Sequence, residues 1–178
     1  MLLKIIKSLR KWINRLYSKL GIGYVDMHSE LGARVIRRDG TEENLGIIAR
    51  KKVTVEFVDY LVDCMQTSTA GFANFKYHLS GTSTQAESNT DTQLITPIGT
   101  ARVVGSQGEG DYPNIYKSIA TIGYGGTYAV TEHGIFNEQY AAAQDNGVLL
   151  DRSVFAAINI ENGDSIQWTY LLTVNPET

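Results

Sequence analysis

Apolar segments separated by tight-turn residues fill the last third of the chain, and this repetition restricts the fold more than any other feature of the sequence. Four segments are rich in β-branched and aromatic residues: 118–122, 129–136, 147–155 and 164–174. Asn-Gly pairs, which favour two-residue hairpin turns, separate the last three of these segments. The pattern predicts antiparallel strands joined by short turns, and therefore a mainly β protein.

The middle of the chain shows weaker strand signals and one helical segment. We expect a hairpin over residues 34–49 with its turn at Asp39-Gly40, and we expect strands over residues 72–79, 94–104 and 114–123 with residues 105–111 as a connection. In residues 53–66, apolar positions such as Phe57, Tyr60 and Leu61 recur at spacings of three and four, which predicts a helix with Thr54 as its N-cap. The valines in that segment leave a strand open as the alternative.

Residues 2–20 carry the clearest helix signal. Six apolar residues recur there at alternating spacings of four and three, which places them on one stripe of a helix: Leu2, Ile6, Leu9, Ile13, Leu16 and Leu20. Gly21 and Gly23 are expected to end the helix, and residues 21–31 to form a linker. We therefore divide the chain into an amphipathic basic helical arm, residues 1–22, and a single β-sandwich domain, residues 23–178.

Charge is distributed unevenly between the arm and the rest of the chain. The first twenty residues hold six basic side chains, and no acidic residue precedes Asp26: Lys4, Lys7, Arg10, Lys11, Arg15 and Lys19. The remaining residues hold ten basic and nineteen acidic side chains, so they carry about nine negative charges. This asymmetry predicts that the arm meets an acidic partner: a protein surface, a membrane face or nucleic acid.

Three interpretations of the arm stay open. It packs on its own domain or on sister copies, where three arms would suit a trimer axis, or it docks on the outside of a larger acidic assembly. Alternatively it lies on a membrane surface, which Trp12 and Tyr17 beside the stripe would suit. We expect no membrane-spanning helix, because no run of eighteen apolar residues exists.

One pair of neighbouring residues, Glu132 and His133, is of the type found in enzyme active sites, and His78 and Asp151 could extend it into a metal or acid-base cluster. Neighbouring residues of a strand point to opposite faces, so Glu132 and His133 cannot both bind one ion without a bulge. A structural role is favoured instead, in which Glu132 pairs with Arg152 across neighbouring strands. Catalytic motifs and paired cysteines are absent from the sequence, so we expect no enzymatic activity, cofactor or metal.

Five tyrosines of the predicted β-sandwich domain suggest either a sugar-binding platform or half-buried packing on sheet faces, and packing is favoured. They are Tyr112, Tyr116, Tyr124, Tyr128 and Tyr140.

Several blocks of sequence resemble a family of small virion proteins of tailed bacteriophages, which are encoded near the capsid genes and are similar to capsid decoration (cement) proteins. The blocks cover residues 75–78, 80–84, 91–92, 114–118, 131–136, 149–155 and 162–170, and the resemblance does not reach the first 30 residues. The resemblance implies a non-enzymatic structural protein on the capsid surface of a virion. It also implies that the major capsid protein is the partner.

We accordingly predict an antiparallel β-sandwich, resembling a jelly roll, with an N-terminal amphipathic helix and one further helix. The protein is expected to be a homo-oligomer, with a trimer as our guess, and to make no specific contact with nucleic acid and none with a membrane. The residues expected to bind the partner lie in the arm: Leu2, Lys4, Ile6, Lys7, Leu9, Arg10, Ile13 and Leu16.

Two rival functions accompany this prediction. A tail-fibre or baseplate protein would recognise a host glycan through the loops at residues 80–92 and 105–111. A hydrolase would use His133 and nearby carboxylates.

Overall fold

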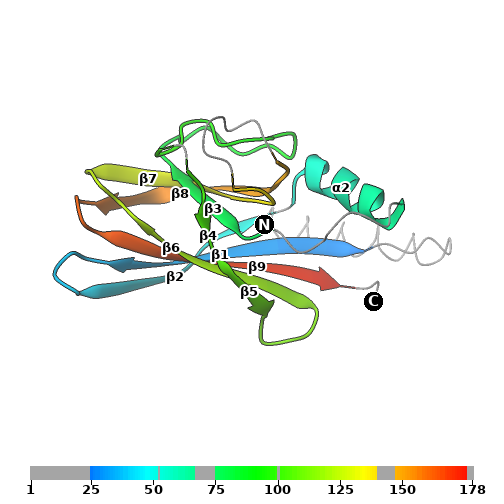
Figure 1. Cartoon of the computed structure of the whole chain (residues 1–178), viewed down its shortest axis with the longest axis horizontal. Helices are drawn as coiled ribbons and strands as arrows, with labels where there is room; N and C mark the ends of the chain where they lie inside the picture. The colour runs from blue at the N-terminus through cyan, green and yellow to red at the C-terminus, as the bar shows by residue number, and fades with distance from the viewer. Residues whose placement is uncertain (1–24, 52, 67–74, 100, 140–146, 176–178) are drawn as a thin grey trace, which may run out of the picture. The chain divides into compact units, whose positions relative to one another are not determined.

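Two antiparallel sheets and one helix form the part of the chain that the computed structural model describes, which is residues 25–51, 53–66, 75–99, 101–139 and 147–175 (Figure 1). The elements are β1 (Asp26–Ile36), β2 (Glu42–Lys51), α2 (Val55–Gln66), β3 (Tyr77–Gly81), β4 (Val103–Val104), β5 (Ser106–Glu109), β6 (Ile115–Gly123), β7 (Tyr128–Phe136), β8 (Leu149–Ile160) and β9 (Ser165–Asn175). The mainly β prediction is confirmed. The predicted arm, residues 1–22, lies outside the described residues.

The strands pair into one sheet of five, in the order β2-β1-β9-β6-β5, and one of four, in the order β4-β3-β7-β8. Figure 1 shows β3, β7 and β8 in a layer above β1, β6 and β9. The hairpins β1–β2, β5–β6 and β7–β8 each stay within one sheet, whereas the connections from β6 to β7 and from β8 to β9 change sheets. The last third of the chain therefore supplies strands to both layers.

Two of the predicted turns are present, and both need glycine. Gly40 in the β1–β2 turn has a φ of 86°, and Gly163 in the β8–β9 turn has a φ of 90°. Side chains disfavour this left-handed region, while glycine adopts it freely. The Asp-Gly and Asn-Gly signals therefore identified these turns correctly.

The inner faces of the two sheets share one hydrophobic cluster. Along β9 every second residue is buried, and these residues pack with buried residues of β7 and β8 from the other sheet. The β9 residues are Ile166, Trp168, Tyr170 and Leu172, and the residues from β7 and β8 are Val130, Ile135, Leu150, Ile158 and Ile160. This is the alternation expected of a strand with one face towards a core.

Strand β7 departs from that alternation, because its residues from Val130 to Phe136 are all buried. A second hydrophobic cluster explains the difference: Leu79, Leu94, Phe136 and Leu149 pack together, with Leu94 coming from the segment 82–98. This segment covers the outer face of the four-stranded sheet, so β7 is buried on both sides.

Helix α2 begins where the sequence predicted, and the strand alternative for this segment is wrong. The Thr54 side chain accepts a hydrogen bond from the Phe57 backbone N–H at 3.1 Å and donates one to the Leu149 carbonyl. It therefore caps the helix and ties it to β8. Phe57 is buried and meets the edge of the Phe75 ring, with 5.1 Å between the ring centroids.

Several predicted boundaries are wrong. β1 begins at Asp26, inside the expected linker, and the expected connection 105–111 contains the strand β5, which pairs with β6. The strand predicted over residues 94–104 is reduced to β4, Val103–Val104. The backbone N–H groups of Ile95 and Thr96 donate to the Glu132 carboxylate instead of a neighbouring strand, and Pro97 has no N–H to donate.

Replacing the capping residue tests how α2 is attached. Thr54→Ala removes the acceptor for the Phe57 N–H and the donor to the Leu149 carbonyl, and we expect the free energy of unfolding to fall by about 1–2 kcal/mol. Urea denaturation followed by circular dichroism measures the change. Thr92→Ala, at an exposed position, serves as the control; equal stability of the two variants would contradict the capping role.

Candidate functional site

The predicted pair of Glu132 and Arg152 is present at the centre of a buried polar network. Arg152 Nε donates to Glu132 Oε2 at 2.8 Å, and neither side chain is exposed to solvent. Glu132 lies on β7 and Arg152 on β8, where Arg152 is opposite Gly134, so the two side chains meet diagonally across the strand pair. The eight predicted arm residues lie outside the described residues.

Glu132 uses both of its carboxylate oxygens to hold the segment 82–98. Oε1 accepts from Thr96 N at 2.7 Å and from Ser83 N at 3.3 Å, and Oε2 accepts from Ile95 N at 3.2 Å in addition to Arg152. Gly81 makes this approach possible, because a Cβ at that position would lie 2.3 Å from Glu132 Oε1. The carboxylate therefore replaces a neighbouring strand as the acceptor for these backbone groups.

Arg152 completes the anchor from the other side. Its Nη1 donates to Asp91 Oδ2 at 3.0 Å and its Nη2 to the Gln85 carbonyl at 3.0 Å. The side chains between these two anchor points are mostly exposed, among them Ser88 and Asn89. One buried ion pair thus holds an exposed, Ser/Thr-rich loop in a defined conformation.

His133 points away from Glu132, into the space between the two sheets. Its Nε2 lies 3.0 Å from His78 Nδ1, and His78 Nε2 lies 2.8 Å from Ser118 Oγ on the five-stranded sheet. The His133 ring also packs on Trp168, with 4.7 Å between the centroids. The prediction that Glu132 and His133 face opposite sides is confirmed, and the two histidines link the layers.

Burial determines the protonation of these inner groups. Desolvation lowers the pKa of His78 to about 3, and it lowers the pKa of His133 well below the ordinary value, with the charge of His78 adding to the effect. Asp151 is buried between Ser29 and Ser153, which both hydrogen-bond to its carboxylate. Desolvation nevertheless raises the pKa of Asp151 to about 6.

The imagined cluster of Glu132, His133, His78 and Asp151 does not assemble as one site. Glu132 faces the loop segment, whereas the two histidines lie between the sheets, and Asp151 contacts Ser29 and Ser153. In the described parts of the chain, no group of three or more His, Cys, Asp or Glu side chains could hold a metal ion.

The tyrosines mostly follow the packing interpretation. The Tyr124 hydroxyl lies 2.8 Å from Ser80 Oγ, and the Tyr116 hydroxyl donates to the Phe75 carbonyl at 2.6 Å. Tyr112 is 67% exposed, and Tyr140 lies outside the described residues. Tyr116 and Tyr124 therefore do not form a common aromatic platform, because the hydroxyl of each is hydrogen-bonded to a different partner.

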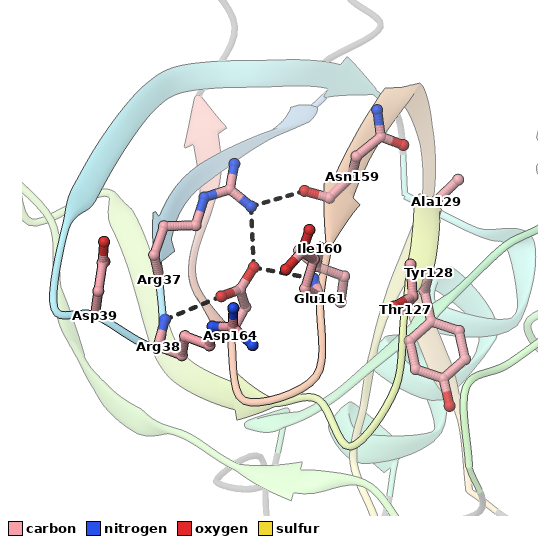
Figure 2. Close-up of a pocket in the computed structure, with 10 residues that line it drawn as sticks. All are labelled: Arg37, Arg38, Asp39, Thr127, Tyr128, Ala129, Asn159, Ile160, Glu161 and Asp164. Carbon is pink, nitrogen blue, oxygen red and sulfur yellow. Dashed lines mark hydrogen bonds and ion pairs between the residues drawn. The ribbon is translucent and has the colours of Figure 1, made fainter.

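An open pocket of about 800 Å³ lies where the β1–β2 turn, the start of β7 and the β8–β9 turn come together (Figure 2). Sequence reasoning missed it. Its lining residues are Arg37, Arg38, Asp39, Thr127, Tyr128, Ala129, Asn159, Ile160, Glu161 and Asp164. The turn signals located two of these connections, but no signal indicated that they meet.

Asp164 organises this pocket. Its carboxylate accepts from Glu161 N, Arg38 N and Arg37 Nη1, each at 3.0 Å, as Figure 2 shows. The hydrogen bond from Glu161 N, followed by those from Arg38 N and Arg37, lowers the pKa of Asp164. Arg37 Nη1 also donates to the Asn159 carbonyl at 2.9 Å. Asp164 therefore joins the two turns that line this pocket.

Comparison with protein-family models, with curated proteins and with solved structures finds no match for the chain.

Among the residues that the structure describes, no helix has both the length and the apolar character that crossing a membrane requires.

Removing the arginine tests the buried anchor. Arg152→Ala leaves the Glu132 carboxylate buried without its cation, and we expect a loss of about 3–5 kcal/mol in the free energy of unfolding. For a unit of this size the melting temperature should fall by about 10 °C or more. The control is Arg50→Ala, which breaks an exposed pair with Glu30 and should cost at most about 1 kcal/mol. Similar melting temperatures for both variants would contradict the anchoring role of Arg152.

The inner histidines predict a loss of stability in acid. Their pKa values are lower in the folded protein than the ordinary 6.5, so the unfolded chain binds more protons and stability decreases as the pH falls from about 6.5 towards 3. Asp151 acts in the opposite direction between pH 6 and 3.8, because its raised pKa makes the folded state bind the proton first. Two histidines against one carboxyl leave a net loss.

Urea midpoints measured between pH 7 and pH 4 test this. His133→Phe removes one titrating group while keeping a ring against Trp168, so the dependence of stability on pH should become markedly shallower. Thr92→Ala, at an exposed position without an ionisable side chain, should leave the dependence unchanged. An unaltered dependence in His133→Phe would rule out this histidine as its source.

Proposed function

We propose that this protein is a non-enzymatic structural component of a phage virion, a capsid decoration protein that binds the lattice of the major capsid protein and stabilises the head. The resemblance of residues 75–170 to small virion proteins supports this proposal. We also propose that the two sheets form a β-sandwich, because buried residues of both contribute to one cluster. Its jelly-roll character stays a prediction.

One observation carries the proposal: the buried ionisable side chains, which could have supported catalysis, hold an exposed surface in place. Glu132 and Arg152 are fully buried and spend their hydrogen bonds on the segment 82–98. A loop fixed on a rigid sheet loses little conformational entropy when it binds, so it suits permanent contact with a partner. This use of buried charge favours a protein that works through the surfaces it presents.

The mechanism relies on repetition. Each copy buries surface across a joint between capsid subunits, and many copies on one lattice turn modest contacts into strong resistance to rupture. The arm contributes through its basic residues Lys4, Lys7 and Arg10, which suit an acidic lattice.

A tail-fibre or baseplate protein that recognises a host glycan is the second candidate. The loop at residues 80–92 is held by the Glu132–Arg152 pair, and the pocket around Asp164 is lined by hydrogen-bonded polar groups. Both features suit recognition of a polar ligand. They do not require repeated binding over a shell, which separates this candidate from the first.

Electron microscopy of labelled full-length protein mixed with capsids that lack it tests the proposal. We expect label over the whole shell, because the lattice repeats the binding site. Label at a single vertex or on the tail would instead support the second candidate. Charge reversal in the arm, Lys4→Glu with Lys7→Glu and Arg10→Glu, should reduce the bound copies at least tenfold. The control reverses Lys76 and Lys117 of the body and should bind normally.

A further inference from the structure

Helix α2 has one buried face and one exposed apolar face. Phe57 is 2% exposed, whereas Val55, Val58 and Val62 are 44%, 41% and 43% exposed. The three valines, which we name the α2 stripe, are three and four residues apart, so they lie along one side of the helix. Isolated exposed valines are common on soluble proteins, but a continuous row on one helix is typical of a contact surface.

The α2 stripe is bordered by negative charge. Asp59 is exposed and lies four residues after Val55 and three before Val62, which places it beside the stripe. α2 also contains Glu56 and Asp63 and has no Lys, Arg or His. A segment that binds this face must therefore offer apolar side chains at helical spacing together with positive charge.

We propose that the α2 stripe binds residues 2–20 of a neighbouring copy of this chain. That segment is predicted to be a helix with apolar residues at spacings of four and three, and it holds six basic residues and no acidic one. Arg10 follows Ile6 by four residues and precedes Ile13 by three, so it borders the apolar row as Asp59 borders the α2 stripe. The two surfaces match in both hydrophobicity and charge.

The occupant is the arm of another copy and not a second α2. Pairing two α2 helices would place acidic residues against acidic residues, which opposes association. Arm and α2 stripe are different surfaces, so the contact is head-to-tail: each copy gives an arm to one neighbour and receives an arm from another, and a ring forms if the rotation closes. This inference concerns the isolated protein and does not depend on the virion role.

The first test disrupts the α2 stripe at exposed positions, where the fold should tolerate the change. In the full-length protein, Val58→Glu with Val62→Glu should reduce the mass measured by analytical ultracentrifugation to that of one chain. The melting temperature of the resulting monomer should stay close to that of the parent protein. The control is Val104→Glu, at another valine that is 52% exposed, and it should remain oligomeric. If the double variant is still an oligomer, for example one held together by the arms alone, the proposal is wrong.

The second test mixes two full-length variants. One carries Val58→Glu and Val62→Glu with an intact arm, and the other carries Ile6→Glu and Ile13→Glu with an intact α2 stripe. Each alone should be monomeric, and the mixture should form a one-to-one pair, because the arm of the first binds the helix of the second. A mixture that stays monomeric would contradict exchange between copies, as expected if the arm folds onto its own chain.

Charge exchange tests the border of the contact. Asp59→Lys should weaken association by about two- to fivefold, the range expected for one exposed ion pair. Arg10→Glu added to the same chain should restore the affinity, because each copy then pairs the reversed charges with its neighbour. If Arg10→Glu does not restore the affinity, Arg10 does not pair with Asp59 across the contact.

Discussion

The ion pair between Glu132 and Arg152 is the constraint around which the four-stranded sheet is organised. Two charges can be buried only when they are paired and their remaining hydrogen bonds are satisfied. Here the partners come from the backbone of the segment 82–98 and from Asp91, so the sheet and its covering segment must form together. This requirement explains why β7 is buried on both faces, and why the glycine at position 81 leaves room for the carboxylate.

Polar groups between the sheets follow the same logic. His78, His133 and Ser118 connect the four-stranded sheet to the five-stranded one, and Asp151 is matched with Ser29 on β1. These contacts specify how the layers pack in a way that a purely apolar interface would not, because each of these hydrogen bonds needs a particular pair of atoms to meet. The same burial that makes the histidines structural keeps them uncharged. Side chains that suggested catalysis in the sequence are thereby committed to holding the fold.

Outward-facing features are the part of the molecule on which the proposed function rests. The anchored loop, the pocket organised by Asp164 and the α2 stripe each present a defined surface on a rigid support. The division of charge, with a basic arm and an acidic remainder, gives such surfaces a preferred orientation towards one another and towards acidic partners. The proposed role, in which copies join one another and a lattice, would use both properties.

Local interactions are what the sequence determined by itself. The glycine turns at positions 40 and 163, the alternation along β9, and the helix capped by Thr54 each depend on residues close together in the chain, so their patterns could be read directly. The pairing of Glu132 with Arg152 was also predictable, because their strands are joined by a hairpin. Only the tertiary structure decided the rest. Residues 94–98 do not form the predicted strand and the turns around Asp164 lie together, because both arrangements depend on partners many residues away.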